Sequence, residues 1–174
     1  DGTVKVKNFP QYGPIPDDLA EGSGKLWFFS GEYNSSSNWG LYTSDGTEAG
    51  TYQVKYFNLQ QDSYHSYNVT GYNGGILFTV FIDGIGRELY FSDGTEAGTY
   101  LVKTIWPGSS GVFIYNFVEL DGIAYFIATS PEGGSELWRT DATEAGTYQV
   151  VELADGVASG ALNMTNFQNT TGTI

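Results

Sequence analysis

The chain has 174 residues, with 20 Asp and Glu against 7 Lys and Arg, and a formal net charge of −13 at pH 7. This acidity disfavours nucleic acids and anionic membranes as partners, because both are bound through clustered basic side chains. The absence of Cys excludes a disulfide framework and a thiolate metal site. The longest apolar run, about seven residues, is too short for a membrane-spanning helix.

One phrase divides the chain into units. Asp-Gly-Thr-Glu-Ala-Gly-Thr-Tyr stands at residues 45–52 and 93–100, and again at 141–148 with Ala142 in place of the first glycine. The three start positions are evenly spaced, with a period of 48 (93 − 45 and 141 − 93). A fixed unit of this length is typical of solenoids, propellers and related arrays.

Each unit contains four short segments that alternate in the manner of strands, and none shows a convincing helical period. The expected strands of the first unit are residues 19–24, 25–29, 41–44 and 51–55. Those of the second are residues 67–70, 76–82, 89–92 and 99–103, and those of the third are residues 115–118, 123–128, 137–140 and 147–151. Each unit is therefore predicted to be a four-stranded antiparallel meander.

The repeated phrase lies between the third and fourth strands of each unit and predicts a hairpin turn. An Asp at its start can accept hydrogen bonds from free turn amides, so we assign a structural role to Asp45, Asp93 and Asp141. The first glycine tolerates positive φ, and Gly50, Gly98 and Gly146 are expected to add a second permissive point. Ala142 lacks this freedom, so the third turn should either avoid positive φ there or carry strain.

Four strands in about 45 residues match one blade of a β-propeller. The continuous apolar strand at residues 76–82 fits a strand buried on both faces between neighbouring blades. We therefore expect an all-β, propeller-like fold, with an open β-solenoid of stacked meanders as the alternative.

The phase of the repeat sets the expected organisation of this single domain. Residues 10–57, 58–105 and 106–153 are blades, residues 1–9 hold the last strand of a preceding blade, and residues 154–174 begin a further one. Strand edges without partners invite pairing with another chain. Copies of the chain are thus expected to complete one another head to tail as a ring or filament, unless the missing strands lie in a longer array.

The recurring acids are also candidates for metal binding. Asp and Glu three residues apart offer Ca²⁺ hard oxygen ligands, together with loop carbonyls and a Thr hydroxyl. The candidate calcium ligands are Asp45, Glu48, Asp93, Glu96, Asp141 and Glu144. The competing interpretation is that each Asp caps its turn and each Glu faces solvent, in which case no cofactor is needed.

The tryptophans likewise divide into residues expected in the core and residues that are candidates for binding. Trp27 and Trp138 lie within strands and are expected in the core between blades. Trp39 lies in a loop rich in Ser and Asn, and Trp106 precedes Pro107-Gly108. These two are candidate exposed platforms for stacking on a sugar ring or meeting a partner.

Catalysis is not expected. The single histidine, His65, lies in a polar stretch typical of a solvated loop. The acids that recur do so once per unit, whereas catalytic groups usually occur once per domain. The chain has two arginines, Arg87 and Arg139, fewer than the three that bind the substrate carboxylate in sialidases, whose Asp-box the turn resembles.

Residues 88–99 and 136–147 resemble the Glu-Leu-Trp-x-x-Asp-Gly-Thr-x-Ala-Gly-Thr repeats of large bacterial secreted and surface proteins. The resemblance implies a propeller-like extracellular module and no activity. The chain departs from the pattern at Gly40, which replaces the first Glu, and at Ala142. We therefore predict a non-enzymatic extracellular module for structure or adhesion, with a glycan-binding propeller lectin as the alternative.

Overall fold

The computed structural model describes residues 2–8, 17–31, 39–57, 68–82, 86–106, 113–130 and 134–151. Within these ranges the chain is all-β, with three four-stranded antiparallel sheets and no helix. The first sheet comprises β1 (Asp17–Gly22), β2 (Lys25–Gly31), β3 (Trp39–Ser44) and β4 (Tyr52–Phe57). The second comprises β5 (Thr70–Tyr72), β6 (Gly75–Ile82), β7 (Gly86–Ser92) and β8 (Thr99–Lys103), and the third comprises β9 (Phe113–Leu120), β10 (Ile123–Ser130), β11 (Gly134–Thr140) and β12 (Tyr148–Val151).

In each sheet the strands pair in chain order, so the expected four-stranded meanders are confirmed. The first two strands of every sheet are joined by a two-residue turn, at Ser23-Gly24, Asn73-Gly74 and Asp121-Gly122. Both residues of each turn have positive φ. This is the type I′ geometry, whose twist matches that of the flanking strands and which Asn, Asp and Gly adopt most readily.

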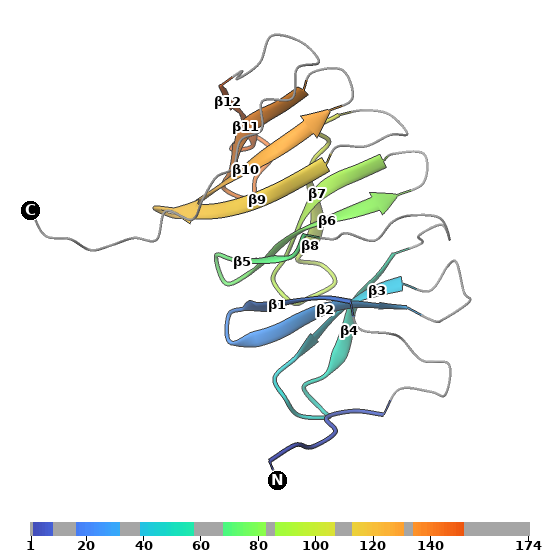
Figure 1. Cartoon of the computed structure of the whole chain (residues 1–174). Helices are drawn as coiled ribbons and strands as arrows, with labels where there is room; N and C mark the ends of the chain where they lie inside the picture. Colours follow the sequence, from blue (N-terminus) through green and yellow to red (C-terminus); the bar gives the residue numbers. More distant parts are fainter. Residues whose placement is uncertain are drawn as a thin grey trace, which may run out of the picture.

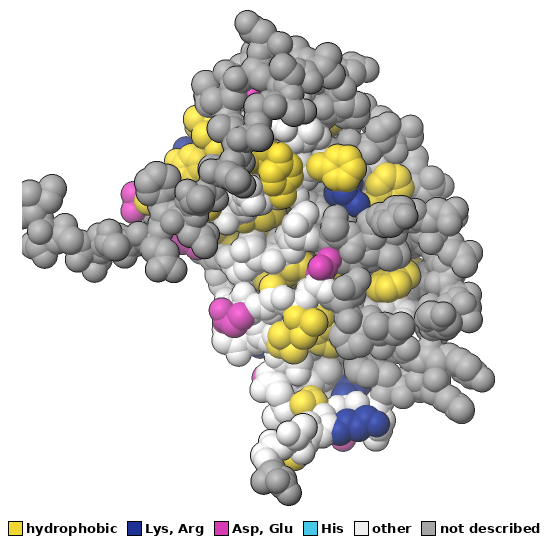
Figure 2. Space-filling view, in the orientation of Figure 1, with side chains coloured by type: hydrophobic (Ala, Val, Ile, Leu, Met, Phe, Trp, Pro, Cys, Tyr) yellow, Lys and Arg dark blue, Asp and Glu magenta, His cyan; other side chains and the backbone are white. Residues whose placement is uncertain are grey.

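The sheets follow one another along the molecule in chain order (Figure 1). One core cluster packs the first sheet against the second through residues such as Trp27, Phe29 and Phe78. Another packs the second sheet against the third through residues such as Leu77 and Phe126. Because successive side chains of β6 enter different clusters, the expected burial of this strand on both faces is confirmed. Figure 2 shows hydrophobic side chains on the face in view, separated by white surface that is made of other side chains and backbone.

The strand expected within residues 1–9 is not formed in residues 2–8, which are described but carry no strand. A strand needs a neighbour for its ladder of hydrogen bonds, and the described residues supply none beside this segment. Residues 154–174 lie outside the described residues, so the expected further blade is not seen. The described part of the chain contains no helix that could cross a membrane.

Candidate functional site

The Asp-Gly-Thr turns form a polar arrangement that the described part of the chain repeats three times. In the second sheet, Asp93 Oδ1 accepts hydrogen bonds from Thr95 N at 2.8 Å and from Thr95 Oγ1 at 2.8 Å. Thr95 Oγ1 in turn accepts from Gly98 N at 2.9 Å. The turns that begin at Asp45 and Asp141 contain the same bonds. Each Asp therefore closes its own turn.

The donated hydrogen bonds also affect ionisation. The Thr95 hydroxyl and then the Thr95 amide favour the charged carboxylate and lower the pKa of Asp93. The pKa values of Asp45 and Asp141 are lowered by their own threonines in the same way. A lowered pKa adds stability above the ordinary value near 3.8, and this stability is lost as the pH falls through the value in the folded state.

A buried pair of hydroxyls closes the base of each turn. Ser92 Oγ lies 2.7 Å from Thr99 Oγ1, which donates to the Thr95 carbonyl at 2.6 Å. The single Thr99 proton is thereby used, so Ser92 donates to Thr99 and accepts from Gly94 N at 3.2 Å. The equivalent pairs are Ser44 with Thr51 and Thr140 with Thr147. Sequence reasoning missed these pairs, although in every copy a hydroxyl residue precedes the phrase and a Thr is its seventh residue.

The later glycine of each turn phrase is required by close packing and not by positive φ, which was the expected reason. Gly50, Gly98 and Gly146 do not have positive φ, so they do not act as a second permissive point. Instead, a Cβ on any of them would overlap with the carboxylate of the Asp in the same turn. The absence of a side chain lets the backbone approach that carboxylate closely.

Ala142 keeps the conformation of the glycines that it replaces. Its φ is 67°, compared with 88° at Gly46 and 97° at Gly94. Of the two expected outcomes, backbone strain is therefore the one observed, at a cost of roughly 1–2 kcal/mol. The Ala142 side chain is buried in the second core cluster, which offsets part of that cost.

Each turn also binds side chains from the preceding unit. Lys55 Nζ donates to the Thr99 carbonyl at 2.7 Å, and Lys103 Nζ donates to the Glu144 carbonyl at 3.4 Å. Tyr52 and Tyr100 donate their hydroxyls to the carbonyls of Gly94 and Ala142, at 3.4 and 3.0 Å. Lys7 makes the equivalent contacts with the carbonyls of Glu48 and Thr51. The turns are thus joints between neighbouring units, a role that sequence reasoning did not assign.

The candidate calcium ligands are spread over the three turns. Within each turn the Asp binds its Thr, while the side chains of Glu48, Glu96 and Glu144 are exposed. Among the described residues no three acidic or histidine side chains gather as a metal group. Moreover, the turn carbonyls that Ca²⁺ would use as additional ligands accept hydrogen bonds from lysine ammonium groups.

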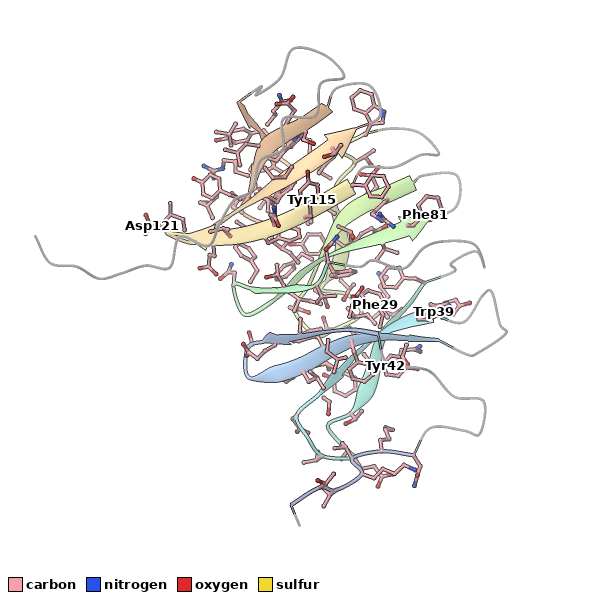
Figure 3. All side chains as sticks on the ribbon, in the orientation of Figure 1. Phe29, Trp39, Tyr42, Phe81, Tyr115 and Asp121 are labelled. Atoms are coloured by element: carbon pink, nitrogen blue, oxygen red, sulfur yellow. The ribbon has the colours of Figure 1, made fainter. Side chains whose placement is uncertain are left out.

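The tryptophans mostly pack against the cores. Trp27 is buried in the first cluster as expected, and Trp138 stacks on Phe126 with ring centroids 6.4 Å apart. Trp39 pairs across the strands with Gly31, and its indole covers the place that a Cβ on Gly31 would occupy (Figure 3). Trp39 and Trp106 are both half-buried against a core cluster, so each presents only part of its ring to solvent.

Glu88 is a buried carboxylate that sequence reasoning overlooked. It is 1% exposed, and its Oε2 accepts a hydrogen bond from Ile105 N at 2.8 Å, just after β8. Its Oε1 has no hydrogen-bond partner among the described residues. Burial raises the pKa of Glu88 to about 7. In the first sheet the residue equivalent to Glu88 is Gly40, and the side chain of Gln53 occupies the space that a side chain on Gly40 would need.

His65 lies outside the described residues, so its surroundings are not seen. Comparison of the chain with models of protein families, with curated proteins and with solved structures finds no match. The resemblance to bacterial surface repeats therefore depends on the motif alone.

Proposed function

We propose that this chain is a non-enzymatic structural and adhesion module of the cell surface or extracellular space, built as a propeller-like stack of repeats. One observation carries the proposal: the Asp and Thr side chains that recur in each turn bind one another, and lysines of the preceding unit bind the turn. Asp93 and Thr95, for example, close a turn, and Lys55 binds that turn from the preceding sheet. The Asp and Thr of the motif therefore serve folding and stacking, and the recurrent side chains that this leaves exposed in the turns are Glu48, Glu96 and Glu144, one per turn.

The approach of the sheets supports the propeller-like arrangement over an open solenoid. Between different sheets, β1 and β5 come closest to each other. A Cβ on Gly71 would overlap with the carbonyl of Glu21, so the backbones nearly touch there. The last strands are linked to the next sheet through the long side chains of Tyr52 and Lys55 and their equivalents. The first two sheets, which converge at their first strands and are joined at their last strands by long side chains, match neighbouring blades around an axis.

Composition supports the extracellular setting. A net charge of −13 causes self-repulsion, which salt in an external medium screens. The bacterial secreted and surface proteins that the motif resembles would occupy the same setting. Assembly of copies head to tail, as a ring or filament, belongs to the same proposal.

Thermal unfolding in the presence of EDTA or calcium tests the structural role of the acids. Asp93→Ala should lower the free energy of unfolding by about 1 kcal/mol, like the loss of a helix cap. Asp93→Asn keeps the acceptor oxygen and should lose less. Neither EDTA nor calcium should shift the melting temperature of the wild type. A large loss of stability on chelation, absent from Asp93→Ala, would make the turn a calcium site and refute the proposal.

A glycan array tests the lectin alternative. The half-burial of Trp39 and Trp106 predicts that no sugar is bound through them. Binding of a glycan by the wild type that disappears in Trp39→Ala or Trp106→Ala would establish a lectin instead.

A further inference from the structure

Residues 2–8 sit on the first sheet in the way that β4 sits on the second and β8 on the third. Lys7, Lys55 and Lys103 occupy equivalent positions in successive units, and each donates to main-chain carbonyls of the turn in the following sheet. In Figure 1 the segment runs past the end of β3 and β4 where that turn lies. The contact that joins one sheet to the next therefore continues below the first sheet.

Residues 2–8 nevertheless lack the packing and the strand pairing that β4 and β8, the last strands of the first two sheets, have. Val6 is 37% exposed, whereas the equivalent Val54 and Val102 are 6% and 3% exposed. β4 and β8 are paired with β3 and β7, but residues 2–8 pair with no strand in the described part of the chain. The segment thus holds the position of a last strand without its neighbour.

We propose that residues 2–8 form an edge strand that is completed by an extended strand from a second copy of this chain. The proposal rests on the assembly role in the proposed function and specifies residues 2–8 as the segment that makes the contact between copies. Continuity with the contact between sheets places the segment in register, and backbone amides and carbonyls outside any described ladder supply the pairing groups. The exposed Lys5 locally offsets the repulsion that a net charge of −13 causes between copies.

Sedimentation velocity of the whole chain over a range of concentrations tests this contact. Val6→Pro removes one amide and prevents the ladder, so the concentration for half-association should rise at least ~tenfold. Lys7→Met removes the anchor on the first turn and should weaken association in the same direction. Lys5→Met is the matched control, because it removes the same charge without removing that anchor, and it should change association by less than about threefold.

Two further measurements show whether residues 2–8 become paired and whether the variant stays folded. Hydrogen exchange at residues 4–6 should slow in the associated wild type, and circular dichroism should show that Val6→Pro keeps its three sheets. If the wild type associates and Val6→Pro associates equally well, this inference is overturned while assembly stands. If the wild type remains monomeric at millimolar concentration, both this inference and the assembly role are overturned, but the structural role of the turns, tested by chelation, is not.

Discussion

The second and third sheets carry the same motif in different surroundings. Their turns have matching bonds, with Thr95 N and Thr143 N at 2.8 and 2.9 Å from the Asp oxygen. In contrast, Leu89 of β7 is fully buried and the equivalent Leu137 of β11 is half-buried. The second sheet has a described sheet on each side, whereas the third has one. The motif therefore determines the turn locally, and position in the stack determines how much each sheet buries.

The largest expected effect tests that difference in burial. Leu89→Ala should lower the free energy of unfolding by about 3–4 kcal/mol, because it leaves a cavity in a fully packed site. Leu137→Ala should cost about half as much, since its side chain is already partly exposed. Denaturant unfolding of both variants measures the ratio. Equal costs would show that the outer face of the third sheet is covered as fully as that of the second.

Glu88 provides a pH-dependent test of burial in the second sheet. Because its folded pKa is raised from 4.5 to about 7, the wild type should lose stability as the pH rises through that interval. The change corresponds to an upper bound of about 3 kcal/mol. Glu88→Gln stays neutral and retains an acceptor for Ile105 N, so it should remove this slope and exceed the wild type in stability at pH 8. Glu96→Gln controls for the loss of one negative charge at an exposed position, and a slope unchanged in Glu88→Gln would contradict the assignment.

A third comparison should show no difference between the two sheets. Gly98→Ala and Gly146→Ala each place a Cβ against the carboxylate of their own turn. Both should cost about 2 kcal/mol, in line with overpacking of a tight site. Melting temperatures that differ strongly between these two variants would mean that the turns are not independent of their surroundings.

The smallest effects on stability are expected at the second residue of the turn phrase, which is Gly in the first two copies and Ala in the third. Gly94→Ala adds strain at positive φ, but its Cβ would make an ordinary contact with Trp27. Ala142→Gly relieves strain but removes a buried methyl group. Each substitution should change stability by less than about 1 kcal/mol in thermal unfolding, because the opposing terms are similar in size. Gly46→Ala should be the worst tolerated of the three, since nothing lies within 4 Å to receive its Cβ.

The local parts of this structure could be predicted and the contacts between sheets could not. Alternation and Asp-Gly pairs identified the strands and hairpins, and the apolar run of β6 indicated burial on both faces. The roles of Lys55 and Gly98 depend on which atoms approach in space, which the repeat phrase alone does not encode. The recurrence of lysine at the same position of successive units was nevertheless visible, and it was the available signal for the contact between units.

The strand expected within residues 1–9 is absent from residues 2–8 for a related reason. Its sequence matches the last strand of each unit, but strand formation also requires a neighbour in space. Glu88 was overlooked because the Glu that opens the repeat motif does not by itself reveal that it is buried or that it binds a backbone amide after β8.

The central claim is that the turn carbonyls bind lysine and that the recurring aspartates are structural. Diffraction from crystals grown with calcium chloride, with anomalous data collected for calcium, tests it most directly. The account predicts the Lys103 ammonium beside the Glu144 carbonyl, with the Asp141 carboxylate bound to Thr143 and no calcium peak at the turn. An anomalous peak coordinated by Asp141 and Glu144, with Lys103 displaced, would contradict it.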